Sequence, residues 1–234
     1  MILLYELLNE CFGMVLSTSL FCFLMNKIIE SDPESNLQKY TKVEGLIFLN
    51  YLFMSHLVIN FTFTNLIDRV FYSLFLSIML MHSYTDSKTK TVYRPFNYLL
   101  WIIGFIYLIV SIVLNRIPIA DGGPKETIFY VILFIIVAWF SVKLKAYGKG
   151  DGYMLIGISL FIPTLGYGTL FTTLEITLCF YVLSAIIQIL TNLKHFTIKK
   201  LKFKEKIAFA PAMYAGILCT MILSKITFLN TFFI

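Results

Sequence analysis

Apolar runs long enough to cross a lipid bilayer follow one another along almost the whole chain, and they constrain its fold more than any other feature. A transmembrane helix needs about 20 consecutive, predominantly apolar residues. Of the 234 residues, 59% are hydrophobic and only 14% are charged, too few to cover a soluble surface. Windows of about 19 residues predict about eight spans, near 7–29, 45–63, 66–85, 96–115, 126–143, 153–170, 173–192 and 207–228. The predicted fold is therefore an all-α, polytopic transmembrane helix bundle.

Two of these spans carry irregular residues. Asp68 and Arg69 fall in the first turn of the third span. Pro163, Gly166 and Gly168 interrupt the end of the sixth, because proline and glycine both disfavour a continuing helix.

The basic residues predict an orientation. If the N-terminus lies outside and the spans alternate, most of the 19 lysines and arginines fall on the cytoplasmic side, as the positive-inside rule describes. Only Arg69, Arg116, Lys125 and Lys225 then fall outside. The lysine cluster at 199–204 lies between two spans, so we expect it to meet membrane lipid headgroups and not nucleic acid.

The cysteines do not suggest a metal site. They are scattered through apolar segments without a CxxC pair, which favours small buried side chains over zinc ligands or disulfides. They are Cys11, Cys22, Cys179 and Cys219.

One carboxylate is surrounded by glycines just before the sixth span, in the sequence Gly148-Lys149-Gly150-Asp151-Gly152. Glycine permits backbone conformations and close approaches that other residues forbid. An extended peptide could therefore lie beside Asp151. The alternative is structural, with Asp151 as the N-cap of the sixth helix, a common position for aspartate.

A second carboxylate, Asp86, ends the run FYSLFLSIMLMHSYTD. The helix macrodipole disfavours an acidic residue at a helix C-terminus. The alternative is structural, with Asp86 and the Thr, Lys and Arg residues after it forming a solvated cytoplasmic loop; the other charges of that loop are all basic, so this alternative does not explain why an acidic residue is there. His82, one turn earlier on the same face, could tune Asp86, although a histidine satisfied by a neighbouring helix is the commoner case.

Asp86 and Asp151 are predicted to lie on the same cytoplasmic face, with two spans between them. Two carboxylates about 3–5 Å apart cannot both ionise easily, so one keeps a proton. This state suits an aspartic protease dyad, in which one carboxylate activates water and the other holds the shared proton.

Three short patterns follow one another along the chain. They are Asp86-Ser87-Lys88 followed by Val92-Tyr93, then Gly148-Lys149-Gly150-Asp151, then Lys206-Ile207-Ala208-Phe209-Ala210-Pro211. Together they resemble the type IV prepilin peptidases, a family of GxGD aspartic proteases of the membrane, over roughly residues 66–230. The chain departs from the family at Tyr93, where proline is more usual, and at Gly152-Tyr153-Met154, where an apolar residue, lysine and leucine are common.

The resemblance implies a membrane-embedded aspartic endopeptidase that cleaves prepilin-like precursors at the cytoplasmic face of a bacterial-type cell membrane. Such precursors carry a short basic leader, usually ending in glycine, ahead of an apolar helix. Asp86 and Asp151 would be the catalytic pair, with no metal or organic cofactor. The residues expected to bind substrate or shape the site are Gly148, Lys149, Gly150, Gly152, Lys88 and Pro211.

The resemblance also divides the chain. Residues 1–65 would hold N-terminal spans and the polar cytoplasmic loop 30–44, and residues 66–234 would form the protease-like core. Larger family members carry an N-terminal methyltransferase region, often with a zinc loop of paired cysteines. Residues 1–65 lack such cysteines, so N-methylation is not expected.

Two other functions stay open. A small transporter is one, because acidic residues in membrane helices often relay ions. Transporters usually place these residues near the midplane and within inverted repeats, whereas both aspartates are predicted at one edge and no repeat is present. A noncatalytic membrane subunit is the other, and it would explain the apolarity but not the paired motifs.

Overall fold

The computed structural model describes most of the chain and divides it into two compact units. The described residues are 15, 18–23, 25–27, 30, 42–90, 92–114, 117, 123–144, 148–165, 169–193, 196–197, 202–203 and 208–232. The first unit combines Met1–Thr91 with Asn192–Tyr214, and the second combines Val92–Thr191 with Ala215–Ile234. Each unit is described by itself, and the predicted functional division at residue 65 stays a prediction.

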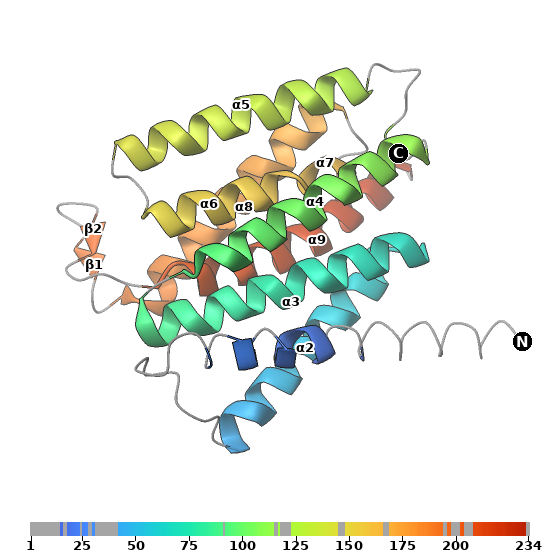
Figure 1. The fold of residues 1–234 in the computed structure, drawn as a ribbon. Helices are drawn as coiled ribbons and strands as arrows, with labels where there is room; N and C mark the ends of the chain where they lie inside the picture. The colour runs from blue at the N-terminus through green and yellow to red at the C-terminus, as the bar shows by residue number, and fades with distance from the viewer. Residues whose placement is uncertain are drawn as a thin grey trace, which may run out of the picture. The chain divides into compact units, whose positions relative to one another are not determined.

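The described residues are almost entirely helical, which confirms the predicted all-α class (Figure 1). Within these residues, strands are limited to β1 (Phe196–Thr197) and β2 (Lys202–Phe203), which pair antiparallel with Phe196 opposite Phe203. A helix satisfies its backbone N–H and C=O groups within one segment, which is the requirement that a lipid solvent imposes.

Four helices in the described part of the chain are long and apolar enough to cross a membrane, which indicates a multi-pass membrane protein. They are α3 (Leu66–Thr89), α4 (Arg94–Val113), α5 (Gly123–Lys143) and α8 (Leu170–Thr191). They match the third, fourth, fifth and seventh predicted spans.

The remaining predicted spans are shorter than a full span, are broken, or lie outside the described residues. The apolar stretches Leu46–Thr62 of α2 (Lys42–Thr62) and Ala210–Ile226 of α9 (Ala210–Phe232) are shorter than a full span. The first predicted span, 7–29, lies largely outside the described residues, as does Cys11.

The sixth predicted span, 153–170, is not one helix. Helix α6 (Lys149–Ser159) ends, and a separate turn, α7 (Ile162–Leu165), follows it. The N–H of Leu160 bonds to the carbonyl of Gly157, three residues back, so the last turn tightens. Pro163 follows, and proline cannot donate the next helical hydrogen bond.

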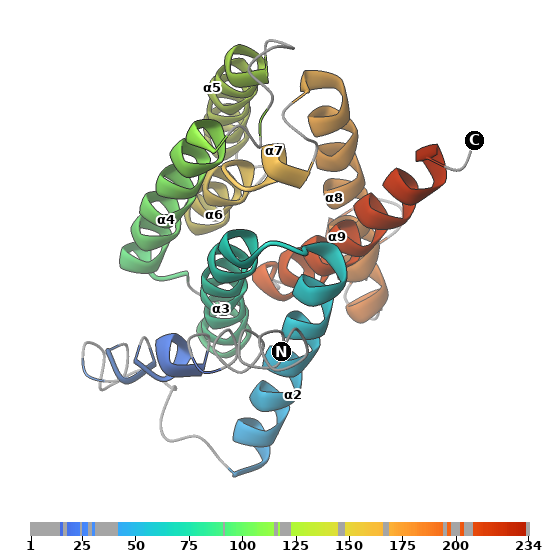
Figure 2. The ribbon, with the colours of Figure 1, turned by 90° about the vertical axis from the view of Figure 1, so that its right-hand side faces the viewer.

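In the second unit, α6 packs against both α4 and α5 (Figure 2). Glycines allow the close approach. A Cβ on Gly157 would overlap the Leu100 side chain of α4, and a Cβ on Gly152 would overlap the Val142 side chain of α5. Small residues at helix contacts are typical of membrane bundles, where they let backbones approach.

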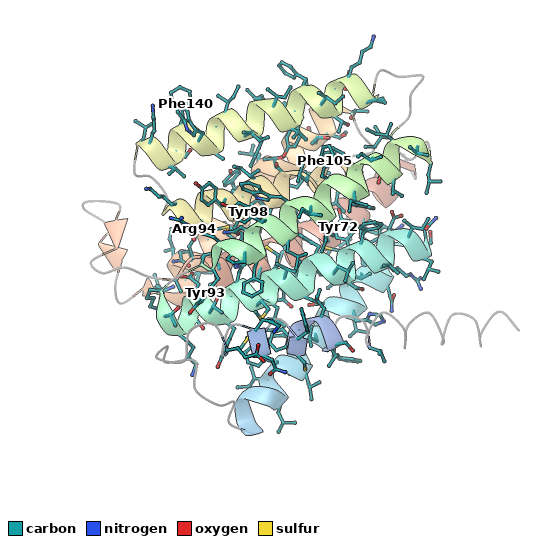
Figure 3. The ribbon with its side chains drawn as sticks, in the orientation of Figure 1. Tyr72, Tyr93, Arg94, Tyr98, Phe105 and Phe140 are labelled. Carbon is teal, nitrogen blue, oxygen red and sulfur yellow. The ribbon has the colours of Figure 1, made fainter. Side chains whose placement is uncertain are left out.

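Helix α5 presents a long apolar surface to its surroundings. Its exposed side chains include Phe129, Ile132, Ile136 and Phe140, the last labelled in Figure 3. A soluble monomer rarely exposes so continuous an apolar stretch, whereas lipid chains accept it. At the end of α5 the Lys143 ammonium lies 4.1 Å from the Trp139 ring centroid, an arrangement typical of the membrane–water interface.

In the first unit, α2 and α3 pack side by side. Helix α3 begins at an N-cap, Asn65, whose side-chain oxygen accepts from the N–H of Ile67 at 2.9 Å. Every residue from Phe75 to Asp86 is buried, so this part of α3, which carries the candidate carboxylate, is enclosed on all faces.

Candidate functional site

Asp86 lies inside α3 and not at its end. The helix continues to Thr89 and closes at Lys90, whose backbone is left-handed with φ 56° and whose N–H bonds to the Asp86 carbonyl at 2.9 Å. This is a left-handed C-cap occupied by lysine where glycine is usual. The prediction that Asp86 ends the helix is therefore wrong by one turn.

The Asp86 carboxylate is only 5% exposed and holds the beginning of α9. Its Oδ2 accepts from the N–H of Ala210 at 3.0 Å, and the N–H of Phe209 also donates to the carboxylate. Ser83 Oγ donates to the carbonyl of Ala210 at 3.2 Å. The first N–H groups of a helix lack internal partners and carry partial positive charge, so a carboxylate is favoured there.

This contact brings two of the three sequence patterns together. Pro211 lies in the first turn of α9, directly after the residue that donates to Asp86. Proline is common near the start of a helix because its missing N–H would have had no partner there. The first and third patterns thus meet within one unit.

Lys90 is the basic residue that the structure places close to Asp86, whereas Lys88 was the predicted one. The Lys90 ammonium interacts electrostatically with the Asp86 carboxylate and donates to the carbonyl of Ser87 at 3.2 Å. Lys88 Nζ lies 5.9 Å from the centroid of the Tyr84 ring. The sequence could have indicated this contact, because Asp86 and Lys90 are four residues apart and become neighbours once the helix is extended by one turn.

Asp151 is the third residue of α6 and is half-buried. The N-cap is Gly148, with φ −62° and ψ 154°, so the interpretation of Asp151 as the N-cap is wrong. A Cβ built on Gly148 would lie 3.0 Å from Asp151 Oδ2, which shows that the carboxylate turns back over the glycine. An acidic side chain in the first turn interacts favourably with the helix dipole.

The other residues of this pattern have distinct surroundings. A Cβ on Gly150 would lie 2.7 Å from Val92 Cβ, so the second pattern packs directly on the Val92-Tyr93 part of the first. Tyr93 and Arg94 mark the beginning of α4 here (Figure 3). A segment of this chain, and not only a substrate peptide, therefore approaches these glycines. Lys149 is exposed.

The structure therefore describes two separate carboxylate environments, each at the first turn of a helix. Asp86, with Lys90 and the start of α9, belongs to the first unit, and Asp151, with Val92, belongs to the second. The pairing of the two carboxylates in one dyad stays a prediction. Within the described residues, no group of three or more His, Cys, Asp or Glu side chains is placed to hold a metal ion. Comparison of the chain with protein-family models, with curated proteins and with solved structures finds no match.

Proposed function

We propose that the chain is a membrane-embedded aspartic endopeptidase that removes the short basic leader of prepilin-like precursors at the cytoplasmic face. The observation that carries the proposal is the docking of the buried Asp86 carboxylate on the N–H of Ala210, beside Pro211. Two of the three ordered sequence patterns share this contact. The second pattern supplies Asp151, whose carboxylate turns back over Gly148 at the start of α6.

In the proposed reaction, one aspartate accepts a proton from water while the water oxygen attacks the carbonyl carbon of the scissile peptide bond. The other aspartate, which holds the shared proton, donates a hydrogen bond to the carbonyl oxygen. The tetrahedral intermediate collapses when the aspartate that took the proton from water gives it to the nitrogen and the C–N bond breaks, which releases the amine. No metal, organic cofactor or methyl transfer is needed.

The proposed topology has about eight spans with the N-terminus outside, in a bacterial-type cell membrane. The excess of basic residues on the inward loops supports this orientation. Reporter enzymes fused after Lys90 and after Leu144 test it, because both positions would be cytoplasmic. Activity of an exported reporter at either position would contradict the orientation.

The test of function is cleavage in membranes. The chain is co-expressed with precursors that carry a basic leader and glycine ahead of an apolar helix, and product size is followed. We expect the parent to shorten the precursor and Asp86→Asn and Asp151→Asn to abolish cleavage while the protein still accumulates in the membrane. Asp68→Asn, at the opposite end of α3, is the matched control and keeps cleavage.

Near-parental cleavage by either Asn variant would sink the two-aspartate mechanism. A small transporter is the second candidate, and the break between α6 and α7 is the observation that favours it, since transporters bind substrates at discontinuous helices. A parent that cleaves no precursor but moves an ion or solute in vesicles, with Asp151→Asn inactive, would select that function.

A further inference from the structure

Asn97, in the first turn of α4, is completely buried, and neither its amide nitrogen nor its amide oxygen has a hydrogen-bond partner in the described part of the chain. Buried polar groups without a partner are rare in native proteins, because each one loses its hydrogen bonds to water. An amide that leaves both a donor and an acceptor unused is therefore able to pair with a polar ligand.

The position of Asn97 on α4 directs its side chain toward α6. Leu100 and Gly104 lie three and seven residues later, on the same stripe of the helix. They contact Gly157 and Leu160 of α6, respectively. Asn97 therefore belongs to the face of α4 that packs on α6.

The register of the two helices then places Asn97 close to Asp151. Helices α4 and α6 run in the same direction (Figure 1), with Leu100 at the level of Gly157. Asn97, three residues before Leu100, falls at the level of Met154, three residues before Gly157. Met154 is in turn three residues after Asp151, or about 4.5 Å along the helix axis.

The contact between α4 and α6 is close at this end. The first turn of α6 meets Val92 through Gly150, which brings no side chain of its own. One turn further along, Trp101 Nε1 donates to the carbonyl of Tyr153 at 2.7 Å and joins the two helices. This hydrogen bond lies at the level of Asn97, so a peptide group reaches Asn97 only if the two helices separate at this end.

We propose that Asn97 is a substrate-binding residue whose amide pairs with a backbone peptide group of the precursor, next to the bond that is cleaved at Asp151. A peptide group offers one N–H and one C=O, which match the free oxygen and nitrogen of Asn97 together. A carboxylate would satisfy only the nitrogen. This inference rests on the proposed function, because its ligand is that enzyme's substrate.

The test compares Asn97→Leu and Asn97→Ser in steady-state cleavage of a synthetic precursor peptide and in thermal unfolding in detergent. Both variants should raise KM by about tenfold or more, the effect of losing a paired amide contact. Asn97→Leu should also keep or raise the unfolding midpoint, since leucine removes two buried unpaired groups. Asn97→Ser, smaller than asparagine, gives the kinetic result if leucine does not fit.

Ser111→Ala is the matched control. Ser111 is also buried without a partner in the described structure, but it lies fourteen residues along the same helix, about 21 Å from Asn97. Its KM should equal that of the parent. Parental KM in both Asn97 variants, with cleavage still dependent on Asp86 and Asp151, would overturn the inference and leave the proposed function standing. If the parent chain cleaves no precursor, both the proposed function and the inference about Asn97 are overturned.

Discussion

Both candidate carboxylates lie against the beginning of a helix, although they reach it in different ways. Asp151 is part of the helix whose first turn it occupies. Asp86 reaches α9 from another helix, across 124 residues of sequence. Backbone N–H groups or a helix dipole thereby hold each carboxylate in a fixed position. A fixed carboxylate suits catalysis, but its hydrogen bonds also stabilise the fold. Variants distinguish the two roles when cleavage and unfolding are both measured.

Asp86→Ala should lower the free energy of unfolding by about 1–3 kcal/mol, because the buried N–H of Ala210 loses its hydrogen-bond acceptor. Asp151→Asn should cost less, about 0.3–1 kcal/mol, the usual contribution of a half-exposed charge at a helix dipole. Thermal unfolding of the two purified variants in the same detergent checks the order. Equal losses would contradict the docking role assigned to Asp86.

Lys90 offers a second prediction at the scale of one residue. Its left-handed backbone, with φ 56°, costs roughly 1 kcal/mol for a residue with a Cβ and nothing for glycine. Lys90→Gly and Lys90→Ala both remove the ammonium, but only glycine relieves the backbone. We therefore expect Lys90→Gly to be more stable than Lys90→Ala by about 1 kcal/mol, measured by thermal unfolding. The reverse order would mean that the turn changes conformation in the variants.

At the scale of elements, the short helix α6 connects the candidate site to the packing of the second unit. Its N-cap glycine, Gly148, is exposed and adjoins only the Asp151 carboxylate. Its Gly152 is buried against α5. Two glycines of one motif thus have different neighbours: Gly148 lies beside the Asp151 carboxylate, and Gly152 lies at the contact with α5.

These different neighbours predict opposite outcomes for the same substitution. Gly148→Ala should keep stability but slow cleavage by roughly tenfold, because the new methyl group displaces the carboxylate. Gly152→Ala should destabilise the protein by about 1–3 kcal/mol, since its methyl group overlaps Val142. Turnover number and unfolding midpoint, measured together, distinguish the two. A Gly148→Ala variant with parental turnover would argue against a catalytic Asp151.

At the scale of the whole molecule, the bilayer is the solvent that makes this composition stable. Four described helices are long enough to cross it, and α5 leaves large apolar side chains exposed along most of its length. In water such surface would drive association. In lipid it carries no such cost, and stability rests on close helix contacts such as those at Gly104 and Gly157.

Ile132, about half exposed near the middle of α5, tests this environment. Ile132→Lys should disfavour membrane insertion of the segment by about 2.5–3.5 kcal/mol, the cost of lysine at a helix centre. Ile132→Ala should have little effect. An insertion assay with a glycosylation reporter measures both. Equal insertion of the two variants would show that this face does not meet lipid.

The helical class and the longest spans were determined by the sequence itself. Apolar runs of membrane length leave the backbone no partner but itself, so α3, α4, α5 and α8 follow from composition and length alone. The two candidate carboxylates were also visible in the sequence, because acidic residues near the ends of such runs are conspicuous. Apolar runs and acidic residues are local features of the sequence, so they can be recognised without knowing which residues lie next to them in the fold.

Tertiary structure decided everything that depends on a distant neighbour. The partner of Asp86 is a backbone group 124 residues away. The break after α6 follows tight turns as well as Pro163, and the sequence placed it too late. The free amide of Asn97 cannot be recognised until its surroundings are known to leave it unpaired. Hydrogen bonding and burial are properties of a residue's neighbours in space, and only the packed helices specify those neighbours.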